Sequence, residues 1–255
     1  MIGVAMESNK NKTGLKMIAL ILIFIILYSI YVVGSYIWNS YKNEQLYNEL
    51  QELKKEELKV LENSNIEKHV ISKLEPFIVI NSDVVGWVKI NDTKIDYPVL
   101  KTDNNDYYLY HNIKNEQTRA GSIFMDFRNE GKGLDRNTII YGHHMKDKSM
   151  FSGLVAYKQK SYYEEHPFIE FDTLYKEIQW EIFSAYITPI DFDYIQTDFS
   201  NDKEFEMFLK DIQSRSLYDT TAHLSKNDKI LTLSTCTYEF ENARFTIHAK
   251  MVESN

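Results

Sequence analysis

The chain has very little cysteine, glycine and proline, and each scarcity excludes a class of structure. Cys236 is the only cysteine in 255 residues, so no disulfide can form within the chain. Nine glycines and four prolines leave no Gly- or Pro-rich linker to divide the region after residue 42. Internal repeats and low-complexity tracts are also lacking. A single domain after residue 42 is therefore the expectation.

Basic residues are too few for a nucleic-acid partner. The formal net charge is −8, of which residues 1–41 contribute +2 and the rest of the chain −10. No stripe of lysine and arginine reverses this balance locally. An acidic surface repels phosphate, so the sequence predicts no nucleic-acid partner.

Charge is missing altogether from residues 17–41. These 25 residues contain no Asp, Glu, Lys or Arg, and a helix of that length crosses a hydrocarbon core of ~30 Å. A cleavable signal peptide would have a shorter apolar region and a better cleavage site than Gly34 and Ser35 provide. Lysines in residues 1–16 favour a cytoplasmic N-terminus. We expect a cytoplasmic tail, an uncleaved single-pass membrane anchor and an extracellular remainder; a buried core helix is the alternative.

Residues 42–76 have the pattern of two helices ahead of the main domain. Apolar residues recur at helical spacing with charges between them. Asn63-Ser64-Asn65 interrupts the pattern, and Pro76 is predicted to end it. A coiled-coil stalk would need more heptads, so we expect these helices to pack on the following domain. The first helix carries Leu46, Leu50, Leu53, Val60 and Leu61 on its apolar face.

Residues 77–255 consist mainly of short apolar runs separated by turn signals. We predict a mainly β fold, either a closed eight-stranded barrel or a sandwich. Two helical inserts are expected at 149–157 and 201–214, the second capped by Ser200 or Asn201. The predicted strands are 86–90, 96–100, 121–127, 137–142, 166–172, 178–187, 229–235 and 244–252.

Residues suited to nucleophilic catalysis occur at the ends of these strands. Cys236 ends an apolar run, and Arg244 opens the last predicted strand eight residues later. If these strands are neighbours, the guanidinium lies beside the thiol, where it favours the thiolate and holds a developing oxyanion. His143 and His144 follow another strand-like run and are candidates to move the proton.

Each of these residues also has a simpler interpretation. A lone cysteine is most often a small buried hydrophobe, and a lone arginine is most often a surface residue. The adjacent pair His143–His144 also fits a solvated turn or metal ligands. A metal site needs a third ligand, and the candidates are scattered, so no metal or other cofactor is expected. These candidates are His111, His166, His223 and His248.

Two motifs together resemble the sortases of Gram-positive bacteria. "TLSTC" at 232–236 is followed by seven residues and Arg244, and "YGHHM" at 141–145 lies about ninety residues earlier. The class B branch fits best, because residues 42–76 are predicted helices and a helix is expected between the sixth and seventh strands. The resemblance covers roughly residues 42–252 and implies an eight-stranded sortase barrel.

The resemblance implies a cysteine transpeptidase. Such an enzyme cuts a surface protein after the threonine of a C-terminal sorting signal and passes the acyl group from a thioester to a peptidoglycan amine. The class norm is an NPxTN-like motif, and variants ending in glycine stay open. Matched to the family's motifs, His143 is the general acid/base, Cys236 the nucleophile and Arg244 the oxyanion-stabilising residue. His144 falls where the family does not require histidine.

Substrate contacts are implied in the connection between the sixth and seventh strands. This connection usually helps to recognise the sorting motif, and here it contains Tyr194 and Ile195. Ser234, inside "TLSTC", is a further candidate. Two other functions are considered: a cell-wall cysteine peptidase that uses water as acceptor, and a non-catalytic surface scaffold. The strand-like run before Cys236 argues against the peptidase, which usually places its cysteine at the start of a helix.

Overall fold

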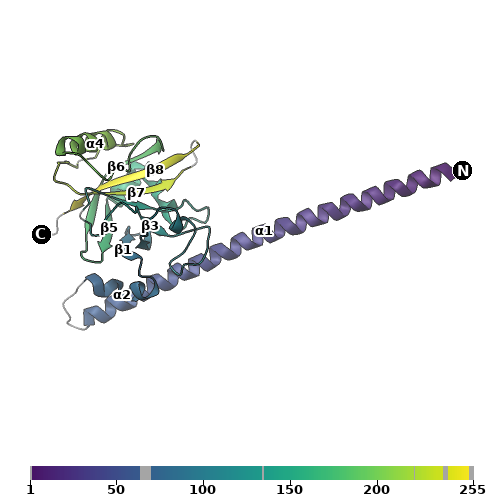
Figure 1. Cartoon of the computed structure of the whole chain (residues 1–255), viewed down its shortest axis with the longest axis horizontal. Coiled ribbons are helices and arrows are strands. Elements are labelled where there is room, and N and C mark those ends of the chain that lie inside the picture. Colours follow the sequence, from purple (N-terminus) through teal and green to yellow (C-terminus); the bar gives the residue numbers. More distant parts are fainter. Residues whose placement is uncertain (1, 64–69, 134, 221, 238–240, 253–255) are drawn as a thin grey trace. The chain divides into compact units, whose positions relative to one another are not determined.

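The computed structural model describes residues 2–63, 70–133, 135–220, 222–237 and 241–252 (Figure 1). The chain divides into two compact units, Met1–Asn43 and Glu44–Asn255. The first unit consists of the N-terminal part of helix α1 (Ile2–Asn63). This helix holds an 18-residue window of mean hydropathy 2.8, long and apolar enough to cross a membrane. The predicted anchor and the first predicted helix after it are therefore one continuous helix.

The second unit is built on a closed barrel of eight strands, as predicted, and the sandwich alternative is wrong. The strands follow one another around the barrel in the order β1-β2-β3-β4-β7-β8-β6-β5. Two neighbouring pairs, β2/β3 and β4/β7, are parallel, and the others are antiparallel. The strands are β1 (Val84–Lys89), β2 (Asp96–Leu100), β3 (Ile123–Met125), β4 (Asn137–Tyr141), β5 (Phe168–Thr173), β6 (Gln179–Pro189), β7 (Ile230–Cys236) and β8 (Ala243–Val252).

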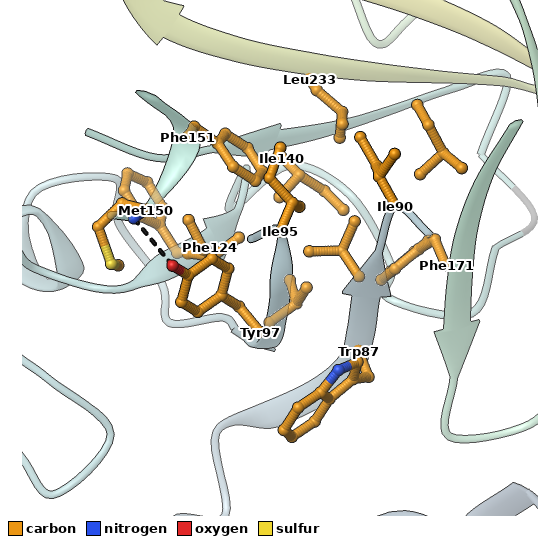
Figure 2. Packing of buried hydrophobic residues seen from close by; sticks show 14 of the residues in the cluster. Trp87, Ile90, Ile95, Tyr97, Phe124, Ile140, Met150, Phe151, Phe171 and Leu233 are labelled. Carbon is orange, nitrogen blue, oxygen red and sulfur yellow. Dashed lines mark hydrogen bonds between the residues drawn. The ribbon is translucent and has the colours of Figure 1, made fainter. Parts of the chain in front are cut away.

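Large apolar side chains fill the barrel. Phe171 and Leu233 point into the barrel, whereas the strand register places Trp87 and Phe124 on its outer face, and all four belong to one buried cluster (Figure 2). The hydroxyl of Tyr97 reaches the same region and accepts a hydrogen bond from the backbone N–H of Met150 at 3.0 Å. Because each strand alternates its faces, the residues that do not fill the barrel point to its outer side.

The part of α1 in the second unit packs on the barrel, as predicted. Leu46, Tyr47 and Leu50 belong to the buried cluster, and Leu53 packs against it. Val60, expected on the same face, is 61% exposed, and the side chain of Leu61 lies outside the described residues. Among the side chains that the structure describes, the apolar packing of α1 is therefore found in the turns that follow Glu44 and is lost by Val60.

Helix α2 (Val70–Ile80) contains Pro76, so the prediction that this proline ends the helix is wrong. A proline inside a helix removes one backbone hydrogen bond. Leu74 and Phe77, on either side of it, are both buried, and the ring of Phe77 lies 4.7 Å from that of Trp87. Burial of these side chains offsets the local cost. The Asn63-Ser64-Asn65 interruption lies mostly outside the described residues.

The expected helix between β6 and β7 is present as α4 (Asp202–Ser214). Asn201 caps it, because its side chain accepts a hydrogen bond from the backbone N–H of Glu204 at 3.0 Å. The other helical insert is the 3₁₀ helix η2 (Phe151–Lys158), and two short elements were not predicted, η1 (Tyr107–Leu109) and α3 (Lys160–Glu165). The buried face of α4 is the predicted one: Phe205, Phe208, Leu209 and Ile212.

Candidate active site

Cys236 and Arg244 are cross-strand partners. Cys236 is the last residue of β7, Arg244 is near the start of β8, and the antiparallel register pairs them directly. Both residues are partly exposed. Leu233 and Phe245 fill the barrel, so alternation places the thiol and the guanidinium on the outer face. The predicted return of Arg244 to the cysteine is confirmed.

The histidine pair lies at the same end of the barrel. Strands β4 and β7 are parallel, and Tyr141 is paired with Ser234. The N–H of Gly142 donates to the carbonyl of Ser234 at 3.2 Å, so the chain continues beside β7 toward Cys236. A side chain at position 142 would collide with Ile123 and Phe151. Glycine is required there because the backbone passes so close to the core.

His143 is held by the segment that contains η1. Its Nε2 lies 2.8 Å from the carbonyl oxygen of Leu109, and its own carbonyl accepts from the N–H of Phe151 at 3.0 Å. A carbonyl oxygen can only accept, so Nε2 carries the proton. In the neutral ring, Nδ1 then holds the lone pair that can take a proton.

His144 is held by the cysteine's own backbone. Its Nδ1 lies 3.0 Å from the carbonyl oxygen of Cys236, so Nδ1 is the donor and Nε2 holds the lone pair. Both histidines are partly exposed. The structure therefore brings both rings to the end of β4, His143 fixed to Leu109 and His144 fixed to Cys236.

Two of the three predicted substrate contacts are joined close to the end of β7, where Ser234 stands two residues before Cys236. The hydroxyl of Tyr194 is 2.8 Å from Oγ of Ser234, and both side chains are buried. Burial raises the pKa of Tyr194; the Ser234 hydrogen bond and the positive charge of Arg244 oppose this, and a negative charge on Cys236 adds to it. Tyr194 is thus within electrostatic range of both residues. Ile195 follows it with a partly exposed side chain.

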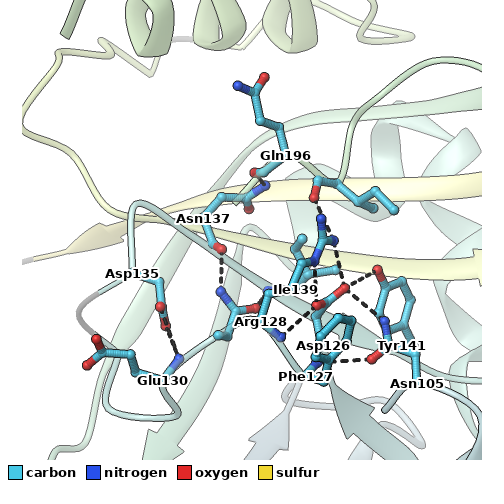
Figure 3. A network of polar contacts seen from close by, with 12 residues as sticks. Asn105, Asp126, Phe127, Arg128, Glu130, Asp135, Asn137, Ile139, Tyr141 and Gln196 are labelled. Atoms are coloured by element: carbon cyan, nitrogen blue, oxygen red, sulfur yellow. Dashed lines mark hydrogen bonds and ion pairs between the residues drawn. The ribbon is translucent and has the colours of Figure 1, made fainter. Parts of the chain in front are cut away.

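Three residues that support the site were missed by sequence reasoning. Leu109 contributes a carbonyl, which any residue carries, so no sequence signal exists. Arg128 donates to the carbonyl of Ile195 at 2.9 Å, and Asn137 donates to the carbonyl of Gln196 at 2.9 Å (Figure 3). These contacts join positions 59 to 67 residues apart, beyond the reach of local pattern.

The four scattered histidines do not gather into a metal site. Within the described part of the chain, no three His, Cys, Asp or Glu side chains are grouped closely enough to hold a metal ion. His111 stacks on Tyr107, and His248 is buried beside Tyr186. This end of the barrel presents a thiol, a guanidinium and an imidazole, a set suited to acyl transfer through a thioester.

A barrel that presents these three groups at one end defines an acyl-transfer enzyme, and comparisons with known proteins identify its family. The family model described as "Sortase domain" matches residues 88–252, so the chain belongs to the sortase family. It is 43% identical over 203 residues to Sortase B of Listeria monocytogenes, which covers 79% of this chain and 82% of that protein. It is 42% identical over 192 residues to Sortase B of Staphylococcus aureus, covering 74% and 79%.

A solved structure leads to the same class. The chain superimposes on the S. aureus sortase B–substrate complex with a TM-score of 0.77 and 38% identity, covering 84% of this chain and 98% of that one. Together these likenesses define a class B sortase, a cysteine transpeptidase. The predicted class is confirmed, and the non-catalytic scaffold is no longer a candidate.

Proposed function

We propose that this sortase is held in the cell membrane by residues 17–41 and anchors surface proteins to the cell wall. The N-terminus lies in the cytoplasm and the barrel outside. Support comes from the uncharged, apolar segment of α1 and from the lysines that precede it. The substrate is a surface protein with a C-terminal sorting signal of the NPxTN type or a variant of it, cut after threonine.

The reaction passes through a thioester on Cys236. The thiolate attacks the threonine carbonyl, and the oxyanion that forms is stabilised by the guanidinium of Arg244. The imidazolium of His143 gives its proton to the leaving amine, and the C–N bond breaks. An amine of the peptidoglycan peptide then attacks the thioester, His143 takes the surplus proton, and Cys236 leaves as the thiolate.

The observation that carries this assignment is the direct cross-strand pairing of Cys236 with Arg244. His143 is the proposed acid/base group, because its ring is fixed by a neighbouring segment and leaves Nδ1 free. His144 is already engaged with the cysteine's carbonyl. Tyr194, Ile195 and Ser234 are proposed to contact the sorting motif, and the hydroxyl of Tyr194 lies 2.8 Å from Oγ of Ser234.

The test uses the purified full chain in detergent and a set of peptides with NPxTN-like motifs. Each peptide is incubated with and without an amine acceptor, such as triglycine or a diamino acid, and the products are weighed by mass spectrometry. The proposal predicts cleavage after threonine and an amide product when the amine is present. If only the hydrolysed product forms even when an amine is present, the peptidase alternative is supported. Equal cleavage by Cys236→Ala would overturn the mechanism.

A further inference from the structure

Three consecutive residues of the β6–β7 connection, Tyr194, Ile195 and Gln196, are held by hydrogen bonds to the rest of the barrel domain. The hydroxyl of Tyr194 bonds to Ser234. The next two residues are held by their main-chain oxygens: Ile195 by Arg128 and Gln196 by Asn137. Both contacts use carbonyl oxygens, and the side chain of Ile195 is partly exposed.

Arg128 is itself held rigidly. Its Nε donates to Oδ1 of Asp126 and its Nη2 to Oδ2, both at 2.8 Å, in the forked geometry that fits a carboxylate (Figure 3). Asp126 is fully buried, and Tyr141 and Asn105 donate to it as well. Burial favours the neutral acid, but the hydrogen bonds from Arg128 and Tyr141 prevail and lower the pKa of Asp126. The pair is therefore ionised at neutral pH.

Asn137 is oriented by a chain of buried hydrogen bonds. Thr232 donates its hydroxyl proton to Oδ1 of Asn137 at 2.6 Å, so that hydroxyl accepts from Nδ1 of His248 at 2.8 Å. Nε2 of the neutral ring then accepts from the hydroxyl of Tyr186 at 2.8 Å. With its oxygen committed, Asn137 has only its amide N–H groups to offer, and one of them meets Gln196.

We propose that Arg128 and Asn137 are positioning residues that set the substrate-recognition segment before substrate binds. They hold the peptide groups of Ile195 and Gln196, and thereby fix where Tyr194 and Ile195 are presented. A segment ordered in advance loses less conformational freedom on binding, so affinity for the sorting motif rises. This inference rests on the proposed function, in which that segment contacts the motif.

Asp126 links Arg128 to β4, the strand that leads to His143. Its carboxylate binds both Arg128 and the hydroxyl of Tyr141, which stands two residues before His143. Loss of Asp126 would therefore disturb substrate binding and chemistry together. Loss of Arg128 leaves Tyr141 on the carboxylate and releases only the recognition segment. The two substitutions are thus expected to differ in their effect on kcat.

The test compares Arg128→Ala, Arg128→Lys and Asn137→Ala with the control Arg136→Ala in the full chain. Arg136 also pairs with an aspartate, Asp202 at 2.6 Å, which lies further along the same connection at the start of α4 and outside residues 194–196. For Arg128→Ala we expect KM for the motif peptide to rise about tenfold, as loss of a charge-assisted hydrogen bond allows, with kcat within about twofold. Arg128→Lys keeps the positive charge but loses the forked guanidinium, so its KM should lie between that of the wild type and that of Arg128→Ala. Arg136→Ala should leave KM unchanged.

Two readouts do not depend on turnover. Hydrogen exchange of the amides in residues 190–198 should be faster in Arg128→Ala and Asn137→Ala, and unchanged in Arg136→Ala. Alkylation of Cys236 by iodoacetamide needs no recognition segment, so its rate should not change in any of these variants.

The inference is overturned if exchange of 190–198 and KM both stay at wild-type values. It is also overturned if kcat and the alkylation rate fall together with KM unchanged, since that marks a defect at the thiol. If Arg128→Ala does not fold, Arg128→Lys and Asn137→Ala decide by the same readouts. Should the wild-type chain cleave none of the peptides, the proposed function fails, while the exchange experiment still decides whether Arg128 and Asn137 order the segment.

Discussion

Cys236 and Arg244 are paired directly across the antiparallel strands β7 and β8. The strand register therefore brings the two residues side by side, and the guanidinium of Arg244 donates to the carbonyl of Ala243 at 3.2 Å. A backbone position set by the hydrogen-bond ladder is present before substrate arrives, and electrostatic stabilisation of a transition state depends on such preorganisation.

Arg244→Ala should lower kcat/KM by about a hundred- to thousandfold, since a donor aimed at an oxyanion contributes ~3–4 kcal/mol. Arg244→Lys should recover only part of this, because an ammonium lacks the planar fork. Steady-state kinetics and thermal unfolding of each variant make the measurement. Near wild-type turnover in Arg244→Ala would show that Arg244 is a surface residue without a role in the reaction. A fall in Tm that accounts for all of the lost activity would show that Arg244 acts on folding alone.

His143→Ala should lose about 10²- to 10⁴-fold in kcat/KM, the usual contribution of a general acid/base group. His144→Ala removes a hydrogen bond to the carbonyl of Cys236 and should keep a large part of the activity. The kcat/KM of His143→Ala and that of His144→Ala are measured with the same peptide over a range of pH. If His144→Ala is the more damaging change, the roles of the two histidines are reversed.

A chain that begins at Glu44 should be soluble and active, because residues 44–53 keep their contacts with the barrel. A chain that begins at Val70 also lacks Leu46, Tyr47 and Leu50. It should lose about 5 kcal/mol in free energy of unfolding, from three buried apolar side chains. Urea denaturation compares the two. Aggregation of the longer chain, or equal stability of both, would contradict the proposed division at the end of the anchor.

Stability should fall as the pH is lowered from 7 to 5. Burial lowers the pKa of His248 to about 3, whereas an unfolded histidine has a pKa near 6.5, so the unfolded state binds the extra proton in this range. The stabilisation is present above pH 6.5 and is lost as the pH falls toward 3. From pH 7 to 5 the loss should be about 2 kcal/mol in free energy of unfolding.

Urea denaturation at the two pH values measures the effect, with His248→Gln as the comparison. Glutamine cannot take up the proton, so the variant should lose about 2 kcal/mol less than wild type between pH 7 and 5. An equal pH dependence in both chains would show that other groups cause it.

Apolar runs were sufficient to predict the strands, because burial of one face imposes a period of two residues. They left a barrel or a sandwich open, and only the family resemblance pointed to the closed barrel. The spacing of Cys236 and Arg244 was sufficient to predict that they meet, since a short connection returns the chain beside itself. Pro76 shows the limit of local rules, because packing of Leu74 and Phe77 outweighs the cost of a proline in the helix.

The supports of the site could not be predicted from the sequence. Leu109 holds His143 through a main-chain oxygen. Arg128 meets Ile195 only because the β3–β4 connection and the β6–β7 connection come together in the folded barrel. Such contacts depend on three-dimensional closure rather than on residue type, and the motif alone does not separate the role of His143 from that of His144.

The central claim is that Cys236 carries the acyl group, and intact-mass analysis of the stalled reaction tests it most directly. The chain is mixed with a motif peptide without an amine acceptor and quenched in acid. The account predicts that the chain gains the mass of the acyl fragment that ends at the threonine. This adduct should map to Cys236 and be absent from Cys236→Ala. That variant should keep its free energy of unfolding within about 1–2 kcal/mol, since its side chain is at the barrel end. An adduct on another residue, or turnover by Cys236→Ala, would contradict the account.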